Sequence, residues 1–545
     1  MPKISQKELS QRNNNKLKLA QLFICVLLVS TYLRFKYISF GLPYLLVPGE
    51  IVNMTGILYL SKDIPKYLFS SDFFNTSPLF LFLNSILVFF NTGTFNINSL
   101  LEKAEFSPEV LYLPLRQLSA VLGIGSIVTV YFIGSIFSPV TAILASAFIS
   151  VSLLHVKFSQ VFLSYSSLCF FSLLSTLFVL KAHKQNNFNF IIPSIIFAFI
   201  SSCINLCGLV SLIPILIYFF LNKEHAKPYF IKLTISTFLI LFIVFNLNII
   251  IPLLSFIKYL IHSYIHGYQI SSHNSYLFYT CTLLPIGVGP VVYFANAALL
   301  FKYKDEHDMN ILKILFSFPL MCLAFFGLFH LTDSGYGVCI VPYLCIGAAI
   351  VFASLFKKKD SRFLFIFLVL LALWIPLKYT LRHNKMLSLS DTRILATEWI
   401  RENTTDSYKV VWGRNSIQPN WHDVYSKNQL IDLGVDKEAL VTKQQFIVKN
   451  KLLKAKSWFQ QLRKKVDYVV VSSLDTEKIF RSQGHSVEKK YYSKFEKLKP
   501  IITFNPYYLQ KEKQIRLLRL EELYSPLETL WQRERTGPLV EIYKL

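Results

Sequence analysis

Long stretches without any charged residue are the feature that most constrains the fold of this chain. Residues 117–156 contain no Asp, Glu, Lys or Arg, and comparable apolar runs recur as far as residue 377. A helix needs about 20 mostly apolar residues to cross a bilayer. Charged residues make up only 16% of the chain, against roughly 25% in a soluble domain. The sequence therefore predicts an all-α polytopic membrane protein.

Eleven membrane spans are predicted from these runs. The first begins at Leu19 after a basic arm and lacks a small-residue cleavage site, so we expect an uncleaved signal anchor. Breaks are expected at Ser138-Pro139 and near Asn205–Gly208, where an apolar run is interrupted. The remaining ten spans are expected within residues 117–156 (two), 158–180, 188–222 (two), 233–257, 276–301, a run ending at 332, 335–356 and 363–377.

The orientation depends on the stretch "SPLFLFLNSILVFF" at residues 77–90, which is short for a span. Basic clusters next to spans are expected to face the cytoplasm. All four such clusters do so only if residues 77–90 do not cross the membrane; the clusters are at 181–184, 222–227, 302–304 and 357–362. We therefore predict a plasma (inner) membrane protein with a cytoplasmic N-terminus and an extracytoplasmic C-terminus.

The composition changes near residue 382, and three regions follow. Residues 1–18 form a basic cytoplasmic arm, residues 19–381 the multi-spanning part, and residues 382–545 a small extracytoplasmic α/β domain. In this last region an Asp391 cap precedes a helical pattern, whereas "YKVVWG", "VDYVVVSS" and "GPLVEIYKL" are typical of strands. Its 30 Lys and Arg against 19 Asp and Glu indicate either a surface for an acceptor or anionic lipid, or a solvated basic face.

The net charge of +24 does not indicate a nucleic-acid partner, because the basic residues are spread over loops and no nucleic-acid motif is present. The eight cysteines lie in or beside apolar runs, which predicts no disulfide framework. With the predicted orientation, four polar segments share the extracytoplasmic face: the outer loop 37–112, the turn 155–165, the loop 258–275 and the connection 330–337. Such convergence is what a site at a membrane surface needs.

The outer loop begins with "VPGEIVNMTGILYLSKDIP" and continues to "NTSPLFLFL". These residues resemble the GT-C glycosyltransferases of the protein O-mannosyltransferase and lipid A aminoarabinose transferase type, in which a Pro-Asp-Glu start leads through a Gly-Asp step to a Pro-Pro-Leu motif. Pro48 and Glu50 match the first motif, Lys62-Asp63 stands at the step, and Pro78-Leu79 matches the last. The resemblance implies a polyprenyl-phosphate-linked sugar as donor.

Two later segments extend the resemblance to nearly the whole chain. "YLPLRQLSAVLG" looks like the family's Arg-Leu-Pro-Ser helix start and carries Arg116, and "HVKFSQVFLSYSSL" looks like its Ser-Gln-Glu-Ala-Arg turn. Several family positions are changed. Gly49 stands where the family has its catalytic Asp, Asn75 or Thr76 replaces an acid or His, and Val161 and Leu163 replace Glu and Arg.

Transfer of a sugar from such a donor needs a base for the acceptor's proton and cations for the leaving phosphate. Glu50 is the predicted base, presented by the Pro-Gly pair in a loop, with a solvated loop acid as the alternative; Asp63 and Asp72 are reserve acids. Arg116, expected at the outer end of its helix, is the first candidate for the phosphate because its fork is always charged. A snorkelling anchor is the alternative for Arg116. Lys157 and Lys258 are further candidates for the phosphate.

Four polar side chains are expected to line the substrate cavity: Gln160, Tyr165, His262 and His266. Gln160 and Tyr165 equally suit polar contacts between helices. The two histidines, four residues apart, suit either a metal on one helix face or an interfacial helix. Because no carboxylate stands beside them, we predict no metal ligand here; no cofactor is assigned, and a divalent cation is left open.

The leading hypothesis is an inverting membrane glycosyltransferase that takes a polyprenyl-phosphate sugar as donor and a glycan, lipid or protein as extracytoplasmic acceptor. Because Gly49 replaces the essential acid, the alternative is a catalytically inactive GT-C scaffold or lipid-binding subunit. A transporter or flippase is a second alternative, although paired charges within the membrane and inverted repeats are not visible in the sequence.

Overall fold

The computed structural model describes residues 6–62, 78–222, 275–301, 306–328, 333–357, 360, 362–404, 410–412, 458–464, 466–473, 492–495, 497–508 and 521–545. They form two compact units, which we treat separately. The helical unit comprises Met1–Ile38, Val52–Asn91 and Tyr112–Leu381, and the C-terminal unit comprises Ser39–Ile51, Thr92–Leu111 and Arg382–Leu545. The predicted limits of the three sequence regions stay a prediction.

Helices dominate the described residues up to Leu387. Their bounds are α1 Gln6–Phe35, α2 Pro48–Lys62, α4 Pro78–Thr92, α5 Ile97–Phe106, α6 Pro108–Phe137, α7 Pro139–Val151, α8 Leu153–Ser159, α9 Tyr165–Gln185, η2 Phe188–Phe190, α10 Ile191–Ile204, η3 Leu206–Ser211, α11 Leu212–Leu221, α14 Ser275–Leu277, η5 Phe278–Leu283, α15 Leu284–Val288, α16 Pro290–Ala295, η6 Asn296–Phe301, α17 Glu306–Leu328, η7 Ser334–Cys339, α18 Val341–Lys357 and α19 Arg362–Leu387.

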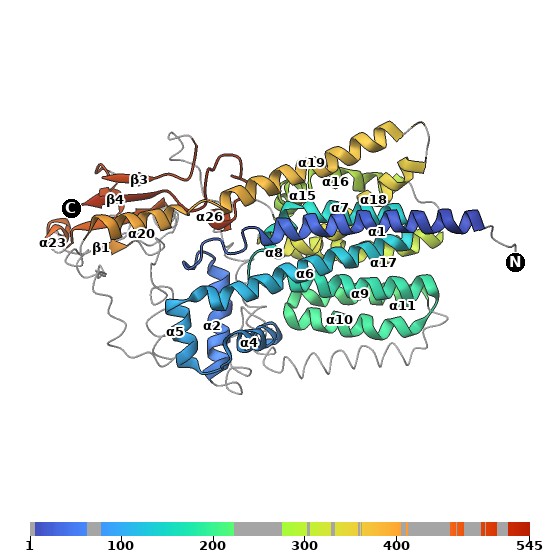
Figure 1. Cartoon of the computed structure of the whole chain (residues 1–545), viewed down its shortest axis with the longest axis horizontal. Coiled ribbons are helices and arrows are strands. Elements are labelled where there is room, and N and C mark those ends of the chain that lie inside the picture. Colours follow the sequence, from blue (N-terminus) through green and yellow to red (C-terminus); the bar gives the residue numbers. More distant parts are fainter. Residues whose placement is uncertain are drawn as a thin grey trace. The chain divides into compact units, whose positions relative to one another are not determined.

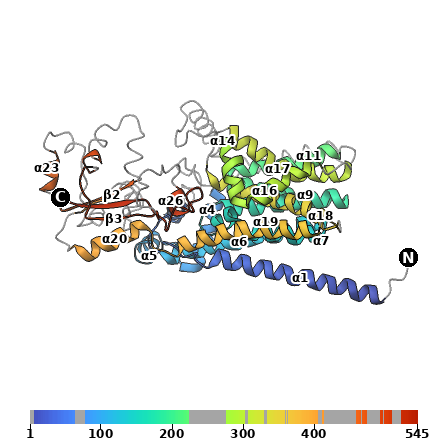
Figure 2. The same cartoon turned by 90° about the horizontal axis from the view of Figure 1, so that it is seen from above.

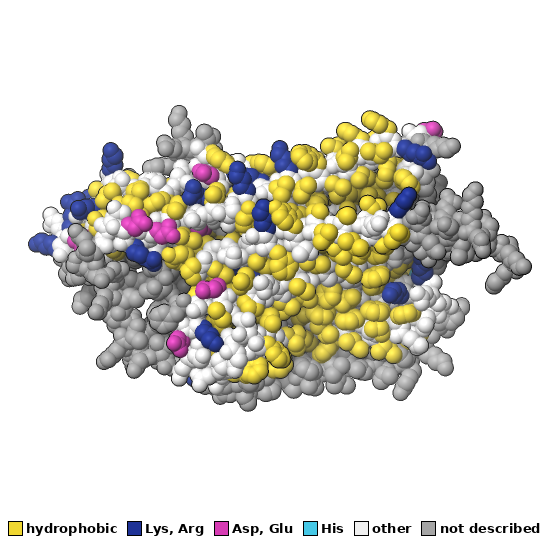
Figure 3. All heavy atoms as spheres, in the orientation of Figure 1, with side chains coloured by type: hydrophobic (Ala, Val, Ile, Leu, Met, Phe, Trp, Pro, Cys, Tyr) yellow, Lys and Arg dark blue, Asp and Glu magenta, His cyan; other side chains and the backbone are white. Residues whose placement is uncertain are grey.

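The helical unit is a bundle of lengthwise helices in which α9 packs against α10, α7 against α18, and α1 against α7 (Figure 1). Apolar side chains cover much of its visible flank (Figure 3). Six helices among the described residues are long and apolar enough to cross a membrane, or up to nine if each bent pair counts as one span. The chain is an integral membrane protein. The predicted span at residues 233–257 lies outside the described part, and the total of eleven spans stays a prediction.

The two predicted breaks are confirmed. Ser138 caps α7 through its hydroxyl, which accepts from the Thr141 amide, and Pro139 takes the first helical position. At the second break α10 ends at Ile204, and Asn205 caps the short helix η3. Gly208 is needed here because a Cβ on it would come within 2.2 Å of the Ser201 carbonyl oxygen.

Residues 276–301 differ from the single straight span that we expected. The helical path turns by 116° between residues 288 and 290. Gly289 has a φ of +89°, a left-handed conformation that favours glycine, and Pro290 starts the next helix without an amide to donate. The backbone preferences of Gly289 and Pro290 therefore bend the helical path, although the apolar composition of this run alone would suit one continuous span.

The C-terminal unit contains a four-stranded sheet in the order β1-β2-β4-β3. Its strands are β1 Val410–Trp412, β2 Tyr468–Ser472, β3 Ile502–Phe504 and β4 Val540–Lys544, joined by the helices α20 Thr392–Asn403, α23 Trp458–Arg463 and α26 Glu521–Tyr524. β1 and β2 are parallel and the other pairs antiparallel, with Val470 opposite Ile542. The predicted strands and α/β class are confirmed.

Helix α20 lies along the sheet (Figure 2). Asp391 caps it as predicted, with its carboxylate accepting from the Arg393 amide. Ala396 and Ile400, one turn apart on α20, pack with Val470 and Ile542 in the apolar core of this unit. The apolar face of one helix and the buried face of the sheet thus form this core.

Replacing Gly537 by Ala should destabilise the C-terminal unit by about 2–3 kcal/mol. Gly537 has a φ of +103°, and a Cβ there would lie 2.1 Å from Thr392 Oγ1 and 2.5 Å from Asp391 Oδ1. Gly93→Ala is the matched control, because Gly93 also has a positive φ, +72°, but open space around it, so a loss of about 1–2 kcal/mol is expected. Thermal unfolding of the solubilised protein measures both, and equal losses would contradict the role of the close contact.

Candidate functional site

Glu50 lies in the first turn of α2 rather than in a loop, because Pro48 and Gly49 already belong to the helix. Its amide donates to the Val47 carbonyl, and its side chain is only 1% exposed. A carboxylate in the first turn of a helix is stabilised by the amides that lack a helical partner. The predicted loop position and the alternative of a solvated acid are therefore both wrong: Glu50 is a buried helix-start acid.

Arg116 lies inside α6, since that helix already begins at Pro108. The expectation that Arg116 marks the end of its helix is therefore wrong, because proline suits a first helical position and extends the helix towards the N-terminus. The side chain is fully buried, and Nη1 donates to the Ile38 carbonyl at 2.9 Å. A snorkelling anchor would reach solvent instead, so this alternative is also wrong. Arg116 connects α6 to the segment that follows α1.

Lys157 lies on α8, a short helix that meets α7 at an angle of 63°. Its side chain is 2% exposed, and Nζ is 5.1 Å from the centre of the Phe158 ring. The bend is held by Ser152, whose hydroxyl donates to the Gly287 carbonyl at 2.7 Å. An ammonium group is therefore kept within the helical unit, next to the bend of an apolar helix pair.

Arg34, near the end of α1, is a buried cation that the sequence analysis missed. Its Nη1 donates to the Ser30 hydroxyl at 2.7 Å and the Ser150 carbonyl at 3.1 Å, and its Nη2 lies 2.8 Å from His155 Nδ1. Gly123 on α6 allows this arrangement, because a Cβ there would be 2.3 Å from Ser159 Oγ and 3.4 Å from Arg34 Nε. Among the described residues no carboxylate forms an ion pair with Arg34.

The predicted turn 155–165 is held from three directions. Gln160 Nε2 donates to the Leu33 carbonyl at 3.0 Å, and Asn53 Nδ2 donates to the Phe162 carbonyl at 2.9 Å. Tyr165 donates its hydroxyl to Asp333 Oδ2 at 2.5 Å. The predicted meeting of this turn with the 330–337 connection is confirmed at Tyr165 and Asp333. Gln160 and Tyr165 thus make polar contacts between segments. This is one of the two roles expected for them; the other is lining the substrate cavity.

The helical unit contains three buried cations, of which Arg34 and Arg116 lie at or contact the end of α1 and the segment just beyond it. Arg34 belongs to that end, Lys157 follows His155 on α8, and Arg116 reaches the carbonyl just beyond α1. Buried cations attract an anion strongly because little water screens them. Such an arrangement suits a phosphate-bearing ligand chemically.

Five predicted site residues lie outside the described part of the chain: Asp63, Asp72, Lys258, His262 and His266. Within the described part, no group of three or more His, Cys, Asp or Glu side chains is placed to hold a metal ion.

Comparisons with solved structures identify the fold. The apo oligosaccharyltransferase of Archaeoglobus fulgidus is similar at a TM-score of 0.52 and 12% identity, over 87% of this chain and 72% of that one. The same organism's AglB, in complex with an inhibitory peptide and a dolichol-phosphate, gives 0.51 and 11%, over 84% and 70%. ArnT from Cupriavidus metallidurans bound to undecaprenyl phosphate gives 0.45 and 10%, over 97% and 98%. No family model and no curated protein matches the sequence.

The chain is therefore a membrane protein that shares the fold of the archaeal oligosaccharyltransferase AglB. More specifically, this is the fold that the motif resemblance to the GT-C glycosyltransferases predicted. The resemblance inferred from the motifs is confirmed at the level of the fold.

Proposed function

We propose that this chain transfers a sugar from a polyprenyl-phosphate-linked donor to an acceptor on the extracytoplasmic side of the membrane. The observation that carries the proposal is the likeness to AglB, which extends over 87% of the chain. AglB has been solved with a dolichol-phosphate, which supports a lipid-linked donor of the same chemical class. The three buried cations of the helical unit supply the charge that a phosphate needs.

The proposed chemistry is one inverting displacement. The acceptor's oxygen or nitrogen attacks the anomeric carbon, the bond from that carbon to the phosphate oxygen breaks, and the polyprenyl phosphate leaves with the bonding electrons. Glu50 takes the acceptor's proton as general base. Arg116 and Lys157, together with Lys258 from outside the described part, stabilise the charge that develops on the phosphate.

The direct test is turnover of donor lipid by the purified protein in proteoliposomes. Radiolabelled mannosyl-, glucosyl- and aminoarabinosyl-polyprenyl phosphates are offered with a membrane extract as acceptor. Release of polyprenyl phosphate together with labelled acceptor is expected. Binding of every donor without cleavage would overturn the proposal in favour of an inactive GT-C protein, and movement of intact donor between leaflets would favour a flippase.

A further inference from the structure

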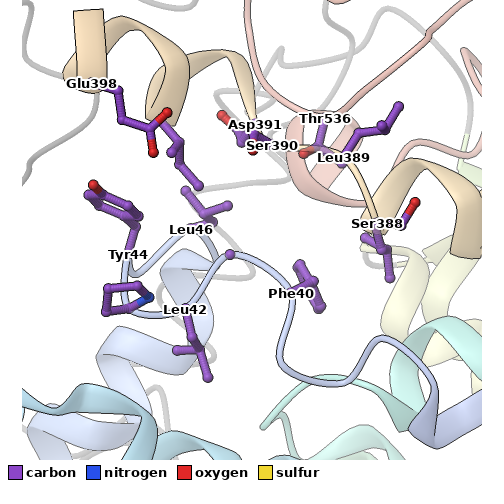
Figure 4. A pocket seen from close by; sticks show the side chains of 14 residues that line it. Phe40, Leu42, Tyr44, Leu46, Ser388, Leu389, Ser390, Asp391, Glu398 and Thr536 are labelled. Atoms are coloured by element: carbon purple, nitrogen blue, oxygen red, sulfur yellow. The ribbon is translucent and has the colours of Figure 1, made fainter. Parts of the chain in front are cut away.

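The C-terminal unit contains a cavity of about 280 Å³. One wall is the segment between α1 and α2, with Phe40 and Tyr44, and the opposite wall is the segment from Leu387 into α20 (Figure 4). Thr536 completes the lining beside Asp391. Its volume is at the small end of the range for ligand pockets, roughly 300–1,000 Å³, and suits one sugar ring rather than a lipid chain.

The polar groups in this cavity are hydroxyls and carboxylates. Glu398 and the hydroxyls of Tyr44, Ser390 and Thr536 form no hydrogen bond with the described residues, although Thr536 is only 3% exposed. Asp391 is already neutralised by Arg393, whose Nε lies 2.9 Å from Oδ1. Glu398 is therefore the one lining carboxylate without a cationic partner in the described part of the chain.

Among the described residues that line the cavity there is no Lys, Arg or His. This is unexpected in a region with 30 Lys and Arg against 19 Asp and Glu. An anionic ligand would meet the Glu398 carboxylate with no cation to offset it. The described lining thus offers no positive charge to a phosphate and suits a neutral ligand with many hydroxyl donors.

The walls of the cavity are firmly built. The Thr392 amide donates to the Thr536 carbonyl at 3.1 Å, and the Thr392 hydroxyl donates to the Pro538 carbonyl at 2.6 Å. Behind Thr536, the buried Arg533 donates to the Gly537 carbonyl and to the Tyr507 hydroxyl. Burial lowers the pKa of Arg533, and the nearby Tyr507 and Glu522 oppose this shift. A pocket formed in advance loses little conformational entropy on binding.

The geometry points to a subsite for a neutral sugar residue of the acceptor. A carboxylate such as Glu398 accepts hydrogen bonds from neighbouring sugar hydroxyls, and Tyr44 and Phe40 offer aromatic surface to the ring. The donor's own sugar does not suit this place, because its anomeric carbon carries the phosphate that Glu398 would repel. The ligand's role as acceptor rests on the proposed function, whereas its chemistry rests on the lining alone.

The test uses the full-length solubilised protein and the methyl glycosides of glucose, galactose and mannose, observed by saturation-transfer NMR. At least one glycoside should bind, and Glu398→Gln should weaken it about tenfold or more by removing a charged hydrogen-bond acceptor. Glu402→Gln is the matched control, because Glu402, like Glu398, is an exposed acid of α20 but lies one turn further along and outside the lining. It should leave binding unchanged.

Three results would overturn the inference: no glycoside binds, Glu398→Gln and Glu402→Gln behave alike, or only ethylamine or inorganic phosphate binds at this cavity. Glycoside binding needs no turnover, so Glu50→Gln should retain it. If glycosides bind as expected but no donor is ever cleaved, the acceptor role falls together with the proposed function and a sugar-binding cavity stands.

Discussion

Replacing Glu50 by Gln should lower the rate of sugar transfer by at least about a hundredfold, since a positioned general base contributes roughly 10²–10⁴-fold. Glutamine has nearly the same size and keeps an oxygen acceptor, but it cannot take the proton that the acceptor loses. The expected signature is a fall in kcat with little change in donor binding. Initial rates in proteoliposomes, with titration of a polyprenyl phosphate, measure both.

Glu109→Gln is the control for this experiment. Glu109 is also an acid in the first turn of a helix and belongs to the same outer loop, but it is exposed. Its replacement should leave the rate within about twofold of the unmodified protein, as surface substitutions usually do. Full activity of Glu50→Gln would remove Glu50 from the mechanism. A loss of activity that is matched by a lower unfolding temperature and lost lipid binding would assign Glu50 a structural role.

The substitution of Gly49 makes this result informative. In the family that the sequence resembles, an Asp stands at this place, and here Glu50 is the one acid in the first turn of α2. If Glu50 carries the reaction, one acid does the work for which the family keeps a pair.

The sequence predicted those features that local chemistry determines. Pro139 with its Ser138 cap, the break from Asn205 to Gly208, the Asp391 cap and the apolar strands were each predictable, because a few neighbouring residues specify them. The membrane class followed from composition, since the bilayer admits few alternatives to apolar helices.

Features that depend on distant partners could not be predicted in this way. Arg34 follows an apolar run like an ordinary basic flank, yet its carbonyl partner Ser150 is 116 residues away. The burial of Glu50 was hidden because Pro-Gly pairs usually mark turns, whereas here they start a helix. The cavity beside Glu398 joins residues 40–46 to residues 387–398, a pairing that no local pattern indicates. The signal that could have pointed to Arg34 is its position: a charged residue directly at the end of an apolar span.

Replacing Arg34 by Met should destabilise the helical unit by at least about 3 kcal/mol, the largest stability effect that we expect. Its guanidinium donates to the Ile149 and Ser150 carbonyls in the last turn of α7, where few helical amides remain to donate; the Ile149 carbonyl also accepts from the Ser152 amide. Methionine fills similar volume but donates nothing. Ser150 and His155 are both buried, so the Ser150 carbonyl and His155 Nδ1 would lose this donor with no water to replace it. Denaturant unfolding in mixed micelles measures the change.

Two further variants separate the contribution that the directed hydrogen bonds of the guanidinium make to stability from the contribution of its charge. Lys36→Met removes an exposed cation two residues away and should change stability by less than about 0.5 kcal/mol. Arg34→Lys keeps the charge but lacks the planar fork that reaches α7 and His155 together, so it should recover only part of the loss. If Arg34→Met unfolds at the same denaturant concentration as Lys36→Met, the end of α7 does not depend on this guanidinium. If Arg34→Lys restores full stability, charge alone, rather than the directed hydrogen bonds, holds α1 against the bend between α7 and α8.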